Sequence, residues 1–316
     1  MRIETPISPD IISPLIYPSG RKRLRPLLTL GATAILLFSL IGCSNENGHS
    51  EMPGVLKIGI LPDESKTVLL KRYTPLFKHL SEELGVPYEL KISKSYATLL
   101  EQFNNKQIDL AYFGGYTFLQ AYHNSRAVPL VMRDIDIYFT SYFIAKANTA
   151  ESNIKDFSGK TFSFGSRLST SGHLMPRYYL KNMNIEPETF FSHVNYSGSH
   201  DTTAYWVKDG ITDIGVTNST ILDKMLQDGR LNKHEIKIIW ETPPYPDYVW
   251  ALQSDYSTTV QTKIREAFLA LTPSNKEHAA ILTHVDAGGF LPASIDDFSK
   301  LNDIALQSGL LDGTHK

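Results

Sequence analysis

Residues 164–172 combine four hydroxyl side chains with two glycines, and Ser169-Thr170-Ser171-Gly172 closes the run. A strand-like stretch, residues 160–164, enters it, and residues 174–183 leave it with helical character. Serine and threonine are preferred helix N-caps, and glycine lets the backbone approach a ligand closely. The first helix amides have no intrahelical partner and carry partial positive charge. The run is therefore a candidate seat for a tetrahedral oxyanion, and an ordinary capped turn is the alternative.

Two α/β units must position this seat. In the first unit, hydrophobic periodicity predicts strands over 55–61, 88–92 and 108–113 and helices over 66–84, 96–104 and 116–123. Strand and helix alternate, which indicates an open, mostly parallel sheet. Two long apolar runs follow, residues 127–132 and 135–147.

The second unit contains the seat. Strands are predicted over 160–164, 191–196, 214–216 and 236–240, and helices over 172–183, 202–208 and 219–227. Three further helices are predicted over 258–272, 279–285 and 295–308. Extended stretches near 140–147 and 240–250 join the two units. Ligands of such sheets bind outside the carboxyl ends of the strands, so two facing lobes form a cleft that can close about a hinge.

The N-terminus carries a targeting segment. Basic residues 21–25 precede an apolar run over 27–41, which is short for a membrane span and has the flanks of a signal peptide. The run ends in Leu40-Ile41-Gly42-Cys43, which resembles the bacterial lipobox, and Cys43 is the only cysteine of the chain. We predict a signal peptide over 1–42, lipidation of Cys43, and a polar tether over 43–54. The protein is then exported and lipid-anchored, facing the periplasm or the cell exterior.

Composition excludes several classes of protein. The formal net charge of −2 argues against nucleic-acid binding, which normally needs a basic surface. A single cysteine leaves no internal disulfide, so stability rests on a packed core. We expect no cofactor, no metal and a monomer.

The order of several motifs resembles the substrate-binding proteins of ABC importers for phosphonate, phosphite and phosphate. The motifs are Tyr96 before residues 106–114, Phe139-Thr140-Ser141, residues 158–162, Ser169-Thr170-Ser171-Gly172 with Pro176 behind it, Gly198-Ser199-His200-Asp201, residues 210–215, and Ile239-Trp240 followed by Pro243, Pro246 and Asp247. The resemblance covers nearly all of residues 55–310. It implies a bilobed α/β fold of the type II periplasmic binding proteins, with a hinge and a ligand cleft between the lobes.

The resemblance also implies roles for the matched residues. The hydroxyls and amides of Ser169, Thr170 and Ser171 would hold the oxygens of the anion, because neutral donors can form oriented, charge-assisted hydrogen bonds. His200 would donate to another oxygen, and protonation would strengthen that bond. Tyr96 would donate its hydroxyl from the opposite lobe.

Two departures from the family pattern bear on the ligand. Relatives that bind aminoalkyl phosphonates use two carboxylates for the ammonium group; Asp247 matches one, and the uncharged Thr220 stands at the other. The tyrosine that the family carries before Ser141 is Phe139 here, which has no hydroxyl. Tyr142 or Tyr138 could supply a hydroxyl, but strand alternation would direct each to the opposite face from Phe139. We therefore expect phosphate, phosphite or a simple alkylphosphonate, held with its proton toward Asp247.

These observations predict the solute-binding component of an ABC importer, which delivers its ligand to a membrane permease and the associated ATPase. It is expected not to be an enzyme. Lobe 1 is expected over 55–143 plus 247–316 and lobe 2 over 144–246.

Three alternatives remain. A hydrolase would use Ser169 and His200, with Asp201 or Asp247 as the third member of a triad, but no Gly-x-Ser-x-Gly elbow is present in the strand-to-helix turn. A metal site would use His173, His193 and His200, whose spacing matches no compact ligand motif. A ligand-sensing lipoprotein would keep the fold and report to a membrane signalling protein.

Overall fold

The computed structural model describes residues 51–311. The predicted signal peptide, Cys43 and most of the predicted tether lie outside the described residues. Between residues 51 and 311, no helix is both long and apolar enough to span a bilayer.

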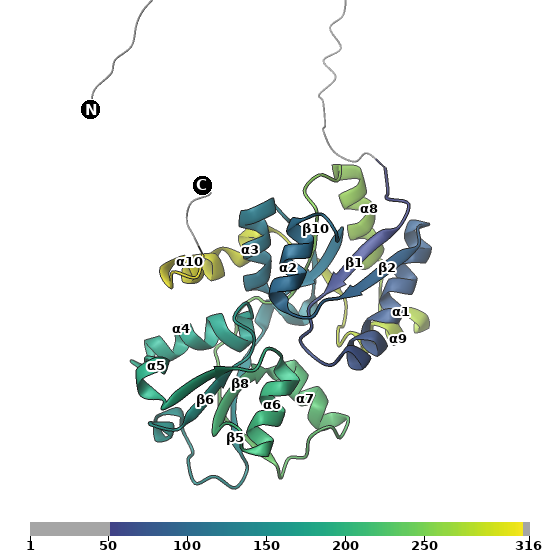
Figure 1. The fold of residues 1–316 in the computed structure, drawn as a ribbon. Helices are drawn as coiled ribbons and strands as arrows, with labels where there is room; N and C mark the ends of the chain where they lie inside the picture. Colours follow the sequence, from purple (N-terminus) through teal and green to yellow (C-terminus); the bar gives the residue numbers. More distant parts are fainter. Residues whose placement is uncertain (1–50, 312–316) are drawn as a thin grey trace, which may run out of the picture. The chain divides into compact units, whose positions relative to one another are not determined.

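Two separate sheets organise the described residues (Figure 1). The large sheet has the strand order β11-β4-β10-β3-β1-β2, and the small sheet has the order β7-β6-β8-β5-β9. The strands of the large sheet are β1 (Leu56–Ile60), β2 (Tyr88–Ile92), β3 (Leu110–Phe113), β4 (Val128–Arg133), β10 (Val249–Leu252) and β11 (Phe290–Pro292). Those of the small sheet are β5 (Ser141–Lys146), β6 (Thr161–Phe164), β7 (His193–Tyr196), β8 (Ile214–Asn218) and β9 (Ile236–Glu241).

Each sheet has its own helices, and a sheet with its helices is called a lobe below. The large-sheet lobe contains α1 (Lys66–Leu84), α2 (Tyr96–Asn104), α3 (Gly115–Ser125), α8 (Thr258–Leu269), α9 (Lys276–His284) and α10 (Ser299–Gln307). The small-sheet lobe contains α4 (Met175–Asn182), α5 (Pro187–Phe190), α6 (His200–Asp209) and α7 (Ser219–Gln227). Short 3-10 turns occur at Asp134–Tyr138, Ile154–Phe157 and Ile295–Phe298.

The amphipathic pattern of α1 shows why these elements form. Its buried positions recur every three or four residues and include Tyr73, Phe77 and Leu80, so one face packs on the core. The helix ends at Gly85, whose φ of 68° is the left-handed conformation that favours glycine. The predicted bounds of α1, β2, α2 and α7 are confirmed.

The prediction of a mostly parallel sheet is only partly correct. The strands β3, β1 and β2 are parallel neighbours, but β10 lies between β3 and β4 and is antiparallel to both. In the small sheet, β5 is likewise antiparallel to β8 and β9. Hydrophobic periodicity identifies single strands and helices. It does not show that β10, which follows the connection from the other lobe, inserts between β3 and β4. A strand over 249–252 was not predicted, because its four residues are all buried and show no alternation.

Two connections join the lobes and run side by side. One leads from β4 through residues 134–140 into β5, and the other leads from β9 through residues 242–248 into β10. Phe139 and Tyr245 form an antiparallel bridge between them, with N–H to C=O distances of 2.9 and 3.0 Å. The predicted lobe boundary at 143/144 falls inside β5, which pairs with β8 from Ser141 onward.

Candidate functional site

The Ser-Thr-Ser-Gly segment forms a wide turn between β6 and α4. Ser169 caps it, since its Oγ accepts the N–H of Gly172 at 2.9 Å. The Leu174 N–H donates to the Ser169 carbonyl five residues back, at 3.0 Å. The regular helix α4 therefore begins at Met175 rather than at the predicted residue 172, with Pro176 in its first turn as expected.

Glycine is required on both sides of this turn. The N–H of Gly165 donates to the Gly172 carbonyl at 2.8 Å, which folds the end of β6 onto the start of the turn. A Cβ at Gly172 would lie 3.2 Å from the Gly165 Cα and 3.0 Å from the Ser169 Oγ. Both glycines of the motif thus permit close approach of β6 and the turn to each other.

The turn contacts both lobes. The Thr170 Oγ1 accepts the N–H of Tyr116, in the first turn of α3, at 2.9 Å. The Ser171 carbonyl accepts the hydroxyl of Ser141 at 2.7 Å. The Ser171 hydroxyl is buried and has no hydrogen-bond partner among residues 51–311. A buried hydroxyl without a partner is unfavourable, so this group is a candidate ligand contact.

His200 begins α6 and is directed at the same turn. Its Nδ1 accepts the backbone N–H of Asn218 at 3.1 Å, so the ring proton is on Nε2. The Nε2 lies 3.4 Å from the Ser169 Oγ. Burial lowers the pKa of His200 to about 3. The imidazole is therefore a neutral N–H donor and does not depend on the protonation considered from the sequence.

Tyr96 and Asp247 reach the site from the large-sheet lobe. The Tyr96 hydroxyl is buried without a hydrogen-bond partner in the described part of the chain. Burial raises its pKa well above the ordinary value, and nearby Asp63 and Asp247 contribute. The phenol is therefore protonated and can donate to an anion.

Asp247 is the acidic group of the site. Its Oδ1 accepts the N–H of Gly115 at 2.9 Å, while its Oδ2 is buried and has no hydrogen-bond partner within residues 51–311. Burial raises the pKa of Asp247 to about 7. A Cβ at Gly114 would lie 3.2 Å from the Asp247 Oδ1, so glycine is needed beside it. The carboxyl group can share a proton with a ligand near neutral pH.

The two positions that depart from the family pattern, Phe139 and Thr220, and the possible substitute Tyr142 lie in different surroundings. Phe139 is buried, with its ring 5.5 Å from the ring of Tyr248. Thr220 lines two cavities, one of about 470 Å³ that Phe139 also lines and one of about 10 Å³. The Tyr142 hydroxyl lies 3.4 Å from the Asp223 carboxylate on α7. The structure therefore does not bring Tyr142 to the buried cluster around Ser171.

Tyr245 is a buried tyrosine beside Phe139. It is paired with Phe139 across the two connections, and its hydroxyl is hydrogen-bonded to the Ser141 Oγ. Its pKa is raised well above the ordinary value, chiefly by burial and also by Asp247. Sequence reasoning missed Tyr245 because the antiparallel bridge that places it pairs residues far apart in the chain.

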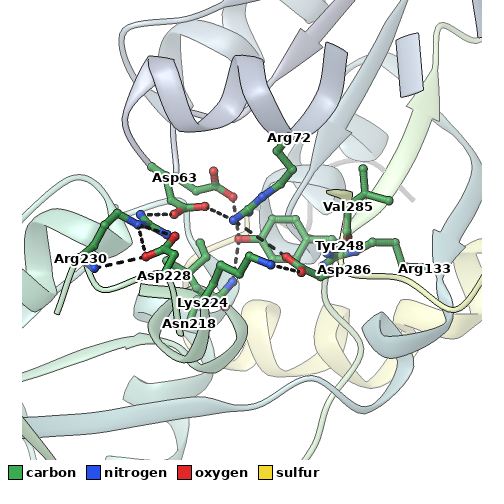
Figure 2. Close-up of polar contacts among 12 residues, drawn as sticks. Asp63, Arg72, Arg133, Asn218, Lys224, Asp228, Arg230, Tyr248, Val285 and Asp286 are labelled. Atoms are coloured by element: carbon green, nitrogen blue, oxygen red, sulfur yellow. Dashed lines mark hydrogen bonds and ion pairs between the residues drawn. The ribbon is translucent and has the colours of Figure 1, made fainter. Parts of the chain in front are cut away.

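Sequence reasoning also missed a group of residues around a small cavity, of which Figure 2 labels Asp63, Arg72, Arg133, Asn218 and Tyr248. Together with the predicted Thr220, they line the cavity of about 10 Å³, and they are Asp63, Arg72, Tyr73, Tyr112, Arg133, Asn218, Ile221 and Tyr248. A cavity of this size holds roughly one water molecule. Asp63 follows β1 and Tyr112 lies near the end of β3, so the rule for carboxyl ends of strands could have identified both.

The contacts of His200 and His173 bear on the hydrolase and metal-site alternatives. His200 Nε2 carries a proton, and Nδ1 is bound to a backbone N–H instead of a carboxylate, so the ring cannot act as a triad base toward Ser169. His173 accepts the Nε–H of Arg177 at 3.1 Å and lies 2.7 Å from the Arg167 carbonyl. These contacts make His173 a structural residue. No group of three potential metal ligands occurs in the region from 51 to 311.

Comparison with known proteins supports a single family. Residues 58–298 match the family model described as the periplasmic phosphonate substrate-binding protein of ABC transporters. A probable phosphite-binding ABC transporter protein of Prochlorococcus marinus (strain MIT 9301) is 31% identical over 264 residues, covering 80% of this chain and 89% of that protein. The phosphonates-binding periplasmic protein of Escherichia coli (strain K12) is 27% identical over 254 residues, covering 78% and 74%.

The structural comparison agrees with the sequence comparison. The structure of PhnD1 from Prochlorococcus marinus (MIT 9301) in complex with methylphosphonate has a TM-score of 0.78 and 30% sequence identity. The alignment covers 82% of this chain and 100% of that chain.

Proposed function

The chain belongs to the periplasmic phosphonate-binding family of ABC transporter substrate-binding proteins, and from this premise we propose that its ligand is a small phosphorus oxyanion: phosphate, phosphite or a simple alkylphosphonate. The family binds solutes for an importer and is not a family of enzymes. Its members work with a membrane permease and an ATPase.

The observation that carries this proposal is a buried set of neutral donors around one acid. The Nε2–H of His200 and the hydroxyls of Tyr96 and Ser171 supply donors to oxygens. Exclusion of water strengthens such bonds to an anion. Asp247 Oδ2 is the acceptor within the same buried set.

Asp247 favours an anion that keeps a proton. An ionised carboxylate repels a fully ionised oxyanion, whereas a P–OH group can donate to Oδ2. Burial already raises the pKa of Asp247 to about 7, and an anion alongside acts in the same direction. Thr220 places no charge in the cleft wall, which disfavours ligands with an ammonium group. The PhnD1 protein of Prochlorococcus marinus is described as phosphite-binding and was solved with methylphosphonate; both ligands fit this reasoning.

The proposed mode of action is capture between two lobes followed by delivery to the permease. Predicted lobe 1 comprises 55–143 plus 247–316, and predicted lobe 2 comprises 144–246. We place the boundary before β5, at the paired connections, because all of β5 belongs to the small sheet. Ser171 and His200 would approach the ligand from the small-sheet lobe, and Tyr96 and Asp247 from the large-sheet lobe. We propose that the protein acts as a monomer.

The proposal includes an anchor on the membrane. Gly42-Cys43 follows an apolar run that resembles the end of a lipoprotein signal peptide, and exported binding proteins need to remain near their permease. A lipid on Cys43 and a flexible tether up to residue 54 would hold the binding domain at the membrane surface.

Calorimetric titration tests the ligand. The protein without residues 1–43 is titrated with phosphate, phosphite, methylphosphonate, 2-aminoethylphosphonate and sulfate. We expect the first three to bind more tightly than 2-aminoethylphosphonate, and sulfate to bind weakly because it carries no proton for Asp247. Ser171→Ala should weaken binding by about tenfold, the effect of one buried hydrogen bond. Ser192→Ala, at an exposed position of the same lobe, is the control. Tightest binding of the amino compound would contradict the proposal.

A further inference from the structure

Four hydrogen bonds form a closed ring through His200. The His200 N–H donates to the Asp63 carbonyl at 3.0 Å, and the His200 Nδ1 accepts the Asn218 N–H at 3.1 Å. The Asn218 Nδ2 donates to the Tyr248 hydroxyl at 3.1 Å, which lies 3.1 Å from the Asp63 Oδ2. Figure 2 shows Asp63, Tyr248 and Asn218 converging in this way.

The chemistry of the groups determines the direction of each bond. The Asn218 Oδ1 accepts the N–H of Ile221 at 2.8 Å and so caps α7. The Nδ2 of Asn218 therefore faces Tyr248 as a donor. Because the Tyr248 oxygen accepts this bond, its own proton is directed to the Asp63 carboxylate. The ring thus has one consistent set of donors and acceptors.

From this ring we propose that Tyr248, oriented by Asp63, is a positioning residue that holds His200 as an Nε2–H donor toward the bound oxyanion. The inference rests on the proposed function. Neither residue needs to touch the ligand for this role. Tyr248 fixes the Asn218 side chain, and the backbone N–H of Asn218 occupies the Nδ1 of His200.

The proton position on His200 decides whether the ring attracts or repels an anion. A neutral imidazole has one donor and one acceptor nitrogen. With the proton on Nδ1, a lone pair on Nε2 would face the anion. Burial keeps the ring neutral, since it lowers the pKa of His200 to about 3. Selection of one tautomer therefore replaces protonation as the means of presenting a donor.

Two bonds of the ring cross between the lobes. Asp63 belongs to the large-sheet lobe, Tyr248 ends the connection that enters β10 of that lobe, and His200 and Asn218 belong to the small-sheet lobe. The His200–Asp63 and Asn218–Tyr248 bonds therefore both lead out of the small-sheet lobe. All four residues are buried, and water cannot replace a lost partner without rearrangement. The donor is thus positioned by both sides of the cleft.

Ion pairs beside the ring also connect the two lobes (Figure 2). The Glu64 carboxylate forms ion pairs with Arg72 of its own lobe and Arg230 of the small-sheet lobe, each at 2.7 Å. Lys224 on α7 lies 3.1 Å from Asp286 across the lobes. These pairs keep Asp63, the neighbour of Glu64, in register with His200.

A double-mutant cycle tests the proposal. The affinities for phosphate, phosphite and methylphosphonate are measured for Tyr248→Phe and Asp63→Asn, each in the wild-type and in the His200→Ala background. Tyr122→Phe, on α3 and outside the ring, is the matched control. Thermal unfolding shows whether each variant is folded. A readout that needs no ligand is the His200 tautomer, measured by carbon and nitrogen chemical shifts of the imidazole.

We expect Tyr248→Phe and Asp63→Asn to weaken binding of all three anions by about tenfold with His200 present and by less than about twofold in His200→Ala, as coupled sites behave. The unliganded wild type should show the Nε2–H tautomer, and Tyr248→Phe should populate the Nδ1–H form. Equal losses in both backgrounds would overturn the proposal. If the wild type bound none of the anions, the proposed ligand would be wrong, and an unchanged tautomer in Tyr248→Phe would then also refute the ring.

Discussion

Replacement of Asp247 by asparagine should make the protein more stable and a weaker binder. The introduced amide keeps an oxygen that can accept the Gly115 N–H, the bond that Asp247 makes at 2.9 Å. The change removes a carboxylate whose pKa rises from the ordinary 3.8 to about 7 through burial. A raised pKa means that the folded state binds the proton more tightly than the unfolded state. The wild type therefore loses stability as the pH rises from about 4 to about 7, and the loss is complete above pH 7.

The size of this effect follows from the two pKa values. Each pKa unit corresponds to about 1.4 kcal/mol, so the ionised Asp247 destabilises the folded protein by about 4 kcal/mol at pH 8. At pH 5 the same group destabilises it by only about 2 kcal/mol. The Asp247→Asn variant has no such dependence, because an amide does not titrate in this range. The difference in the free energy of unfolding between Asp247→Asn and the wild type should thus grow by about 2 to 3 kcal/mol between pH 5 and pH 8.

Urea unfolding of the unliganded proteins at pH 5 and pH 8 measures this difference, and calorimetry at both pH values measures anion binding. Asp303→Asn, an exposed position on α10, removes the same charge and serves as the control. Binding of hydrogen phosphate should weaken by at least about tenfold in Asp247→Asn, because its amide donates where the carboxylate accepted. The reasoning is refuted if the variant is no more stable than the wild type at pH 8, or binds phosphate equally well.

Three further predictions concern other parts of the chain. Gly114→Ala should weaken anion binding by roughly tenfold, because its Cβ would lie 3.2 Å from the Asp247 Oδ1; an unchanged titration would contradict this. Glu64→Gln removes a buried carboxylate that holds two arginines at 2.7 Å and should destabilise the protein by about 3 kcal/mol, measured by urea unfolding. A gain in stability would show that the ion pairs do not hold the lobes. Cys43→Ser should abolish incorporation of labelled fatty acid in cells and release the protein from the membrane fraction, and retention of either would exclude Cys43 as the anchor.

The sequence anticipated much of the fold because its signals are local. The apolar spacing of residues 66–84 and the glycine that follows are sufficient to define α1 and its end. The hydroxyl cluster at 169–171 is similarly visible, because a cap and its helix are adjacent in the chain. Asp213 helps to hold its lobe together, because its carboxylate accepts the N–H and the hydroxyl of Thr161 at 2.8 and 2.7 Å.

Contacts between residues that are far apart in the chain could not be predicted from the sequence. The position of β10 depends on a strand that returns from the other lobe, and no periodicity encodes such a neighbour. Tyr245 lies beside Phe139 only because the two connections between the lobes pair. Asp63 could have been selected by its place after β1, but its partner Tyr248 is 185 residues away.

The amino-acid sequence by itself determined the two α/β units and the hydroxyl-rich turn at Ser169–Ser171, since residue type and short-range spacing specify these, and the resemblance of its motifs to a known family supplied the class of ligand. Only the tertiary structure decided the protonation of the site. The His200 tautomer depends on the backbone of Asn218, 18 residues away, and the pKa of Asp247 depends on burial by both lobes. Burial and hydrogen-bond direction are properties of the packed molecule, because they arise where segments distant in sequence exclude water together.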